Sequence, residues 1–485
     1  MRRMPALTMR LALLLAIALP AAALAQDAKT VISDASTVMG VTGMNSITYS
    51  GAAAQGNFGQ SRVISFGLAS TSIRNYTRTI DFTRPTSHAT GLATPPTPRS
   101  GGPAPQNAPY DQTIASDSPW VQQYSIWVTP WGFLKGAAAS NNATVRSKKI
   151  DDVTYKMVTW SPSQKAPSGQ PYKVIGYIGP QNTVDRVETW VEHPIFGDMH
   201  VEIAYTKYQD LNGIKAPAMM RQRQVGMETF VQQISSASAN PANLAQLLAP
   251  APDAAGRGAG AGPAAPGPAA SEKLADGVYR ITGGYVSLAV EFKDYVVVVE
   301  GGQNEARGLA VIAETKRLFP AKRIKYVVNT HPHFDHAGGL PPFVAEGITI
   351  LEDDNSKFFM EASLGSPRTL VGDALAKSKK KPKVEGVIDQ MVLQDETRTL
   401  ELHHVKDLEH SDAMLIAYLP KEKILFTADF NIPAPGQPVS PSIPTLIANI
   451  DRLHLDFDRY VTVHAPNPDR PLTRADLMAL VKGTN

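Results

Sequence analysis

The stretch of residues 329–339 constrains the fold most, because it places three imidazoles and one carboxylate between His331 and His336. The residues before it, 323–329, include apolar and β-branched side chains typical of a strand. The two glycines that end the stretch allow a sharp turn into a helix, which we expect from Leu340. The four polar side chains are therefore predicted to lie on a loop between a strand and a helix, where metal ligands can converge.

Imidazole and carboxylate groups in this spacing point to a metal site, since neutral histidine and aspartate are good zinc ligands. The alternative is a histidine-rich surface loop, but the apolar strand before it and the Gly-Gly pair after it favour the metal site. The pattern His-x-His-x-Asp-His, at His331, His333, Asp335 and His336, resembles the signature of the metallo-β-lactamase superfamily. The resemblance implies a four-layer αββα sandwich of the α/β class for the C-terminal part of the chain.

Three later residues match further motifs of that superfamily in order: His410, Asp429 and His464. Each is predicted at or just outside the end of a strand. The resemblance implies that His331, His333 and His410 hold a first metal, that Asp335, His336 and His464 hold a second, and that Asp429 bridges them. His403 and His404 are alternatives to His410, but as neighbours in a predicted strand they face opposite sides.

The resemblance also implies an activity. Two zinc ions per chain are expected, with iron or manganese as alternatives, and Asp335 would orient a metal-bound hydroxide that cleaves an ester, thioester, lactone or amide of a small molecule. Asp429 stands where true β-lactamases tend to carry Cys or Ser, which favours the hydroxyacylglutathione hydrolases, lactonases and phosphodiesterases of the superfamily. A mononuclear iron oxygenase on the same fold, similar to persulfide dioxygenases, is the alternative.

The chain of 485 residues is too long for one ordinary domain. Residues 1–25 combine a basic start, a short apolar run and a small-residue cleavage site, which predicts a signal peptide and a secreted or periplasmic protein. The apolar run is too short to span a bilayer, so no stable membrane span is expected after cleavage. We expect a β-rich domain over 26–248, an Ala/Pro/Gly linker over 249–272 and the hydrolase domain over 273–485.

The β-rich domain is predicted to be a curved antiparallel sheet, preceding the αββα sandwich. Residues 210–213, Asp-Leu-Asn-Gly, predict a hairpin turn, and 86–109 are expected to form a loop because they are dense in Pro, Gly and Thr. Asn240 and Pro241 predict the start of a short helix that ends near residue 248. The half-apolar strands predict that one face packs on a helix or holds an apolar ligand.

The strand layout of this domain resembles the half-barrel of periplasmic lipoprotein carriers. A lipid or envelope partner is therefore a further expectation, and a binding protein with a subordinate metal domain is a third hypothesis. Without the three arginines of the first 25 residues, 44 Lys and Arg balance 44 Asp and Glu, so nucleic acid is not an expected partner. The chain has no cysteine, which excludes disulfides and thiolate metal ligands.

Overall fold

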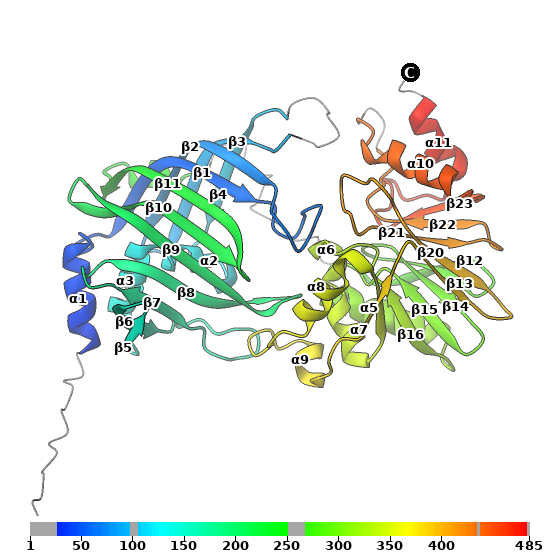
Figure 1. Cartoon of the computed structure of the whole chain (residues 1–485), viewed down its shortest axis with the longest axis horizontal. Coiled ribbons are helices and arrows are strands. Elements are labelled where there is room, and N and C mark those ends of the chain that lie inside the picture. Colours follow the sequence, from blue (N-terminus) through cyan, green and yellow to red (C-terminus); the bar gives the residue numbers. More distant parts are fainter. Residues whose placement is uncertain (1–26, 98–104, 251–266, 434–436, 483–485) are drawn as a thin grey trace, which may run out of the picture.

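A computed structural model describes residues 27–97, 105–250, 267–433 and 437–482 (Figure 1). The expected signal segment and most of the expected linker lie outside these residues. Among the described residues, no helix combines the length and the apolar character that a membrane span needs. The chain is a mixed α/β protein with three sheets, a large antiparallel sheet in the N-terminal part and two packed sheets in the C-terminal part.

The N-terminal sheet has eleven strands in the order β4-β3-β2-β1-β11-β10-β9-β8-β7-β6-β5, all paired antiparallel. Their bounds are β1 Ser46–Gly56, β2 Ser70–Asp81, β3 Thr86–Thr94, β4 Ala108–Ile114, β5 Thr144–Ile150, β6 Val153–Trp160, β7 Val174–Ile178, β8 Val184–His193, β9 Gly197–Leu211, β10 Ile214–Gln224 and β11 Met227–Ala239. The predicted curved sheet is confirmed. Asn212 and Gly213 turn β9 into β10 with φ of 56° and 77°, as the hairpin motif predicts.

Two local predictions in this part were wrong. Residues 86–109 are not a loop throughout, because β3 and the start of β4 lie there and pair with each other and with β2. Cross-strand pairing outweighs the turn-forming composition, and threonine itself favours strands. The short helix α4 is Leu244–Leu248 with Asn243 at its N-cap. Asn240 instead takes a φ of 49° and accepts hydrogen bonds from the N–H groups of Asn45 and Ser46.

The helices α2 Trp120–Trp127 and α3 Pro130–Ala139 lie within the curve of this sheet, and α1 Ala28–Val38 packs on α3 at its edge (Figure 1). Pro130 begins α3, and the Thr129 side chain caps it by accepting the N–H of Gly132. The helices and the sheet share one core, in which Trp120, Trp131 and Trp160 are buried. The expectation that one sheet face packs on helices is confirmed.

The C-terminal part is a sandwich of two sheets. The first has seven strands in sequence order, β12 Ala270–Ala275, β13 Val278–Thr282, β14 Ser287–Glu291, β15 Tyr295–Val299, β16 Arg323–Val328, β17 Thr349–Asp353 and β18 Val384–Val387. The second has six, β19 Gln390–Gln394, β20 Thr399–His404, β21 Leu415–Leu419, β22 Ile424–Thr427, β23 Arg459–Thr462 and β24 Leu472–Thr473. Apolar side chains of both sheets form one core between them.

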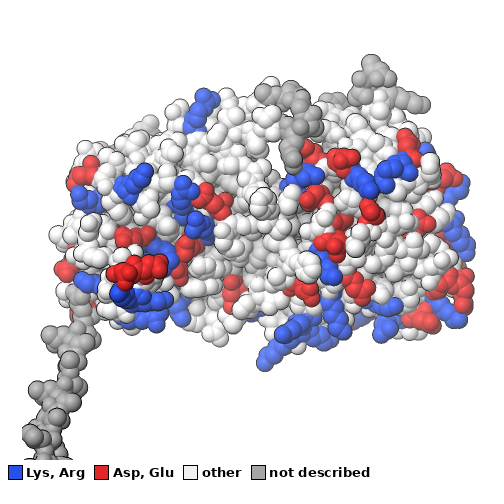
Figure 2. All heavy atoms as spheres, viewed as in Figure 1, with Lys and Arg blue, Asp and Glu red and all other residues white. Residues whose placement is uncertain are grey.

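Helices cover the outer faces of the sandwich (Figure 1). On the first sheet lie α5 Glu305–Leu318, α7 Leu340–Glu346, α8 Asp354–Leu364 and α9 Ala374–Ser378, which packs on α7. On the second lie α10 Ser442–Arg452 and α11 Arg474–Lys482. The predicted four-layer αββα arrangement is confirmed. Over the face shown in Figure 2, Lys and Arg are interspersed with Asp and Glu.

A buried polar group fixes the start of the 329–339 loop, where β16 ends beside β15 and β17. Glu352 on β17 is fully buried and accepts hydrogen bonds from Asn329 Nδ2 at 2.8 Å and from Ser356 Oγ at 2.6 Å. Burial raises the pKa of Glu352 to about 8, against an ordinary value of 4.5, and the donors only partly offset this. The carboxyl group therefore keeps its proton in the folded protein at neutral pH.

Replacing Glu352→Gln should remove a pH dependence of stability. The folded protein holds a proton on Glu352 that the unfolded chain releases above pH 4.5, so this contribution to stability is complete below pH 4.5 and lost by about pH 8. Relative to Glu352→Gln, the free energy of unfolding of the wild type should fall by a few kcal/mol as the pH rises across that range, because each unit of pKa difference corresponds to ~1.4 kcal/mol. Urea unfolding between pH 5 and 9 measures this. The exposed Glu361→Gln serves as control, and parallel curves for wild type and Glu352→Gln would contradict the assignment.

Candidate metal centre

The 329–339 loop brings three buried imidazoles to the end of β16. After His333 the chain forms one turn of helix, α6 Phe334–Ala337, and then enters α7 at Leu340. His331, His333 and His336 have no exposed surface. Loops of the second sheet supply the predicted residues outside the motif. His410 lies between β20 and β21, Asp429 follows β22 and His464 follows β23. The strands β22 and β23 are parallel neighbours, so Asp429 and His464 lie at the same edge of the sheet.

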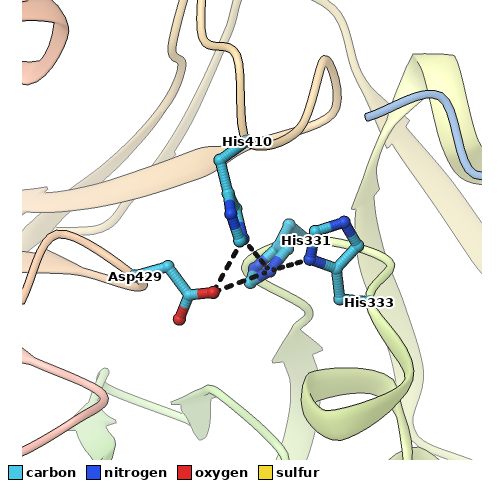
Figure 3. A group of neighbouring side chains, drawn as sticks. All are labelled: His331, His333, His410 and Asp429. Carbon is cyan, nitrogen blue, oxygen red and sulfur yellow. Dashed lines mark hydrogen bonds and ion pairs between the residues drawn. The ribbon is translucent and has the colours of Figure 1, made fainter. Parts of the chain in front are cut away.

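All seven predicted ligands meet at this place, in two groups. The ligand atoms within each group all lie within 4.8 Å of one another. The first group, shown in Figure 3, is His331, His333, His410 and Asp429. The second is Asp335, His336 and His464.

In the first group the ring nitrogens converge on one another. His331 Nε2 lies 3.1 Å from His333 Nδ1 and 3.2 Å from His410 Nε2. Oδ2 of Asp429 lies 2.7 Å from His410 Nε2 and 3.5 Å from His331 Nε2. One nitrogen from each of three histidines and one carboxylate oxygen therefore face a common point.

The other oxygen of Asp429 faces the second group. Oδ1 lies 2.7 Å from His464 Nε2 and 3.0 Å from His336 Nε2, while Asp335 Oδ2 lies 3.6 Å from His336 Nε2. Asp429 has a φ of 56°, a left-handed conformation that aspartate tolerates better than most residues. Its carboxylate thus presents one oxygen to each group, which is the arrangement that a bridging ligand needs.

The hydrogen bonds around the motif fix which nitrogen of each histidine faces inward. The Thr330 hydroxyl donates to Glu300 Oε2 at 2.7 Å, so its oxygen can accept from His331 Nδ1 at 3.3 Å. Glu300 Oε2 also lies 3.2 Å from His336 Nδ1. Because a carboxylate only accepts, Nδ1 of His336 donates to Glu300, and Nε2 is the nitrogen that faces the centre.

His333 is held by a residue far away in the sequence. Its Nε2 lies 3.1 Å from the carbonyl oxygen of Ser61, which can only accept, so Nδ1 is left to face His331. All three motif histidines therefore direct one ring nitrogen into the cluster and use the other for an outer hydrogen bond. This donor set of nitrogen and carboxylate oxygen fits zinc and related divalent metals.

The electrostatics agree with neutral imidazoles in the first group. Burial, assisted by the neighbouring His336, lowers the pKa of His331 well below its ordinary value. Burial and His410 lower the pKa of His333 to about 4. Burial would raise the pKa of Asp429, but the surrounding imidazoles hold it far below its usual range. For His336, the carboxylates of Asp429 and Glu300 overcome the effect of burial and raise the pKa.

The alternatives to His410 lie outside both groups. His404 Nδ1 is 2.6 Å from Asp353 Oδ2, and His403 Nε2 is 2.9 Å from Glu401 Oε2. The local strand pattern had placed them on opposite faces of β20. Glu300 has a φ of 73° and, besides its contacts with Thr330 and His336, accepts the N–H of Gly302, so it supports the motif without joining either group.

Sequence reasoning missed two residues that bind Asp335. The Tyr285 hydroxyl donates to Asp335 Oδ2 at 2.7 Å, and Gln60 Nε2 donates to Asp335 Oδ1 at 2.6 Å. Gln60 and Asp335 are 275 residues apart, so no local pattern could have joined them. Together with His336 these donors lower the pKa of Asp335, although burial acts in the opposite direction.

Gln60 belongs to a segment of the N-terminal part, residues 57–62, that covers the metal-binding loop. We call this segment the cap loop. The N–H of Phe334 donates to Gly59 O at 3.1 Å, and Arg62 Nε donates to Leu408 O at 3.0 Å, near His410. Gly59 has a φ of 82°, and a Cβ there would lie 2.1 Å from the Phe334 ring. Only glycine allows so close an approach.

An aromatic cluster fastens the same contact. Phe334, between two predicted ligands, packs edge-on against Phe58 at 5.1 Å and Phe196 at 5.4 Å between ring centroids. His193 lies 5.0 Å from the same ring, and burial lowers its pKa to about 3, so it is an uncharged member of this cluster. A second contact joins Arg368 to the carbonyl groups of Pro194 and Ile195. The N-terminal part therefore forms one wall of the metal centre.

Known proteins resemble the C-terminal part of this chain. Residues 281–465 match the sequence model of the metallo-beta-lactamase superfamily. Similar solved structures include a metallo-beta-lactamase from Pontibacter korlensis (19% identity, TM-score 0.35, covering 44% of this chain and all of the other). A metallo-beta-lactamase from Erythrobacter litoralis has 16% identity and a TM-score of 0.34, and the match covers 44% of this chain and 96% of the other. A metallo-beta-lactamase from Hirschia baltica has 18% identity and a TM-score of 0.33, and the match covers 44% of this chain and 97% of the other. A comparison with curated proteins gave no match. The resemblance that the motif predicts is therefore confirmed over residues 281–465, which match the metallo-β-lactamase superfamily.

Proposed function

We propose that this chain is a metal-dependent hydrolase that binds two zinc ions and cleaves an ester, thioester, lactone or amide of a small molecule. The observation that carries the proposal is the pair of ligand groups that share Asp429, one oxygen to each. His331, His333 and His410 would hold one ion, Asp335, His336 and His464 the other. The sequence of residues 1–25 supports a secreted or periplasmic location.

When bound, such a metal pair supplies Lewis acidity, which polarises a carbonyl group and lowers the pKa of water toward about 7. The protein supplies a proton acceptor. Asp335 is held on one oxygen by Tyr285 and on the other by Gln60, and its lowered pKa keeps it ionised at neutral pH. Its carboxylate is therefore ready to orient an attacking water and take its proton. Burial and Asp335 raise the pKa of Tyr285, so the phenol stays protonated and keeps donating.

The cap loop contributes to the same site in two ways. The Ser61 carbonyl selects the tautomer of His333 that keeps Nδ1 free for a metal. Phe58 and Phe334 form an apolar wall beside the centre, and such walls strengthen the electrostatic interactions of groups within a site. We propose that the N-terminal part is a structural component of the active site, and that a lipid or envelope partner is a separate role.

The two-group geometry favours a hydrolase over a mononuclear iron oxygenase. An oxygenase with one iron needs only the first group, whereas the second group here is also complete, with its three ligand atoms within 4.8 Å of one another. A metal count on the purified full chain separates the two. About two zinc ions per chain support the hydrolase, and a single iron with oxygen uptake would move the assignment to the oxygenase.

The double substitution His331→Ala with His333→Ala should abolish hydrolysis of esters, thioesters and lactones and reduce the bound metal from about two ions to about one ion per chain. Both residues supply inward nitrogens to the first group, so nothing remains there but His410 and Asp429. Activity assays and elemental analysis measure the effect, with circular dichroism to check the fold. His200→Ala, on β9 and outside both groups, is the control. If the double variant hydrolysed these substrates at the wild-type rate, the proposal would be wrong.

Gly59→Ala should weaken zinc binding and lower kcat, because the new Cβ must push Phe334 and with it the metal-binding loop. Gly67→Ala is the matched control: Gly67 also has a positive φ, of 57°, but a Cβ there meets nothing within 4 Å. Both variants carry the same kind of backbone strain, and only Gly59→Ala disturbs the centre. Zinc affinity measured by competition with a chromogenic chelator, together with kcat, distinguishes them. Equal behaviour of the two variants would show that the cap loop does not act on the site.

A further inference from the structure

A cavity of about 240 Å³ lies inside the N-terminal sheet, between its strands and α2. Its walls come from β1–β4, β9–β11 and α2, and they include the apolar side chains of Ile203, Met220 and Phe230. Arg78 on β2 is the sole formally charged side chain among the described residues that line it. None of the seven predicted metal ligands lines it, so the cavity is separate from the metal-binding groups, although Phe58 of the cap loop contributes to its wall.

Arg78 is buried without a compensating carboxylate. It is 8% exposed, and its guanidinium donates to Ser87 Oγ and Ser125 Oγ, both at 3.0 Å. No Asp or Glu of the described part of the chain forms an ion pair with it. A buried cation that has only neutral partners is costly, because its charge has been taken out of water without an opposite charge in return.

The tyrosines around Arg78 do not supply that opposite charge. Burial raises the pKa of Tyr110 and of Tyr124 to about 12, so both phenols are neutral near pH 7. Burial likewise raises the pKa of Tyr49 and of Tyr76. The cavity therefore carries one net positive charge, set in a wall of aromatic rings.

A second polar group in the cavity wall also has no partner. Gln232 on β11 is 9% exposed, and its Oε1 atom is buried with no hydrogen-bond partner. Buried amide groups are normally hydrogen-bonded, so this oxygen leaves one polar atom of the cavity wall open to a ligand or to ordered water. The amide of a glutamine can be turned so that its NH₂ group faces the cavity as a donor. Gln232 then adds an uncharged donor to the wall of the same cavity.

We propose that this cavity binds a small monocarboxylate with an apolar chain or ring, whose carboxylate pairs with the Arg78 guanidinium. A guanidinium matches the two oxygens of a carboxylate, and one cation balances one negative charge. The apolar wall takes the remainder of the molecule. The volume lies below the usual range of drug-sized pockets, roughly 300–1,000 Å³, which points to a ligand of modest size.

Isothermal titration calorimetry of the full chain with octanoate tests this assignment. We expect saturable binding of one octanoate per chain, retained in the variant with His331→Ala and His333→Ala, since the metal centre takes no part. Failure of the hydrolase proposal would leave this binding unchanged. Loss of octanoate binding in that double variant would show that the carboxylate binds at the metal centre, and it would overturn the cavity assignment.

Arg78→Met should weaken octanoate binding at least about tenfold, as expected for a charge-assisted pair in a buried site. Arg78→Lys should restore part of it. Arg221→Met, on β10, removes an exposed arginine that pairs with Glu228 and should leave binding unchanged. Unchanged affinity in a folded Arg78→Met protein would overturn the proposal.

If Arg78→Met does not fold, the wild-type protein alone can test the proposal, through its preference for a negatively charged ligand. Octanol and octylammonium share the apolar chain but lack the negative charge, and both should bind at least about tenfold more weakly than octanoate. Inorganic phosphate lacks the apolar part and should also bind more weakly. Binding of octanol or octylammonium as tight as that of octanoate would exclude a role for the cation. Phosphate binding as tight as octanoate would exclude the apolar requirement.

Discussion

The Asp429 carboxylate is the interaction on which the centre depends. Two groups of imidazoles contact opposite oxygens of this one side chain. His410 lies 2.7 Å from one oxygen and His464 lies 2.7 Å from the other, so the carboxylate links loops that follow different strands. Few residues could replace it, because the backbone at 429 takes a φ of 56° and the side chain must be a short carboxylate. Without bound metal the imidazoles around it hold this carboxylate in its charged form.

The residues that surround that carboxylate are themselves held in place by hydrogen bonds from residues further out. The motif histidines are held from behind by Glu300, Thr330 and Ser61, each of which determines which ring nitrogen faces inward. Behind these lies a neutral layer, in which Glu352 keeps its proton and bonds Asn329 at the exit of β16. A site built this way needs little rearrangement when a ligand arrives, which is the physical basis of preorganisation.

The parts of the site that depend on a local sequence pattern could be predicted from the sequence. A strand followed by His-x-His-x-Asp-His and Gly-Gly is a continuous signal, and His410, Asp429 and His464 each follow or precede a recognisable apolar strand. The sandwich and the curved N-terminal sheet follow from similar periodic signals. Gln60, Ser61 and Tyr285 could not be found in this way, because their roles exist only once distant segments have packed together. The error at β3 has the same origin, since partner strands rather than composition hold it in the sheet.

The close approach of Gly59 to Phe334 couples two positions in separate parts of the chain, 59 in the loop between β1 and β2 and 334 at the start of α6. The carbonyl groups that receive Phe334 and His333 belong to the cap loop, so the metal-binding loop reaches its final geometry only when the two parts of the chain are packed together. In related chains the side-chain sizes at positions 59 and 334 are expected to vary together, because any bulk gained at 59 has to be removed from the ring it faces.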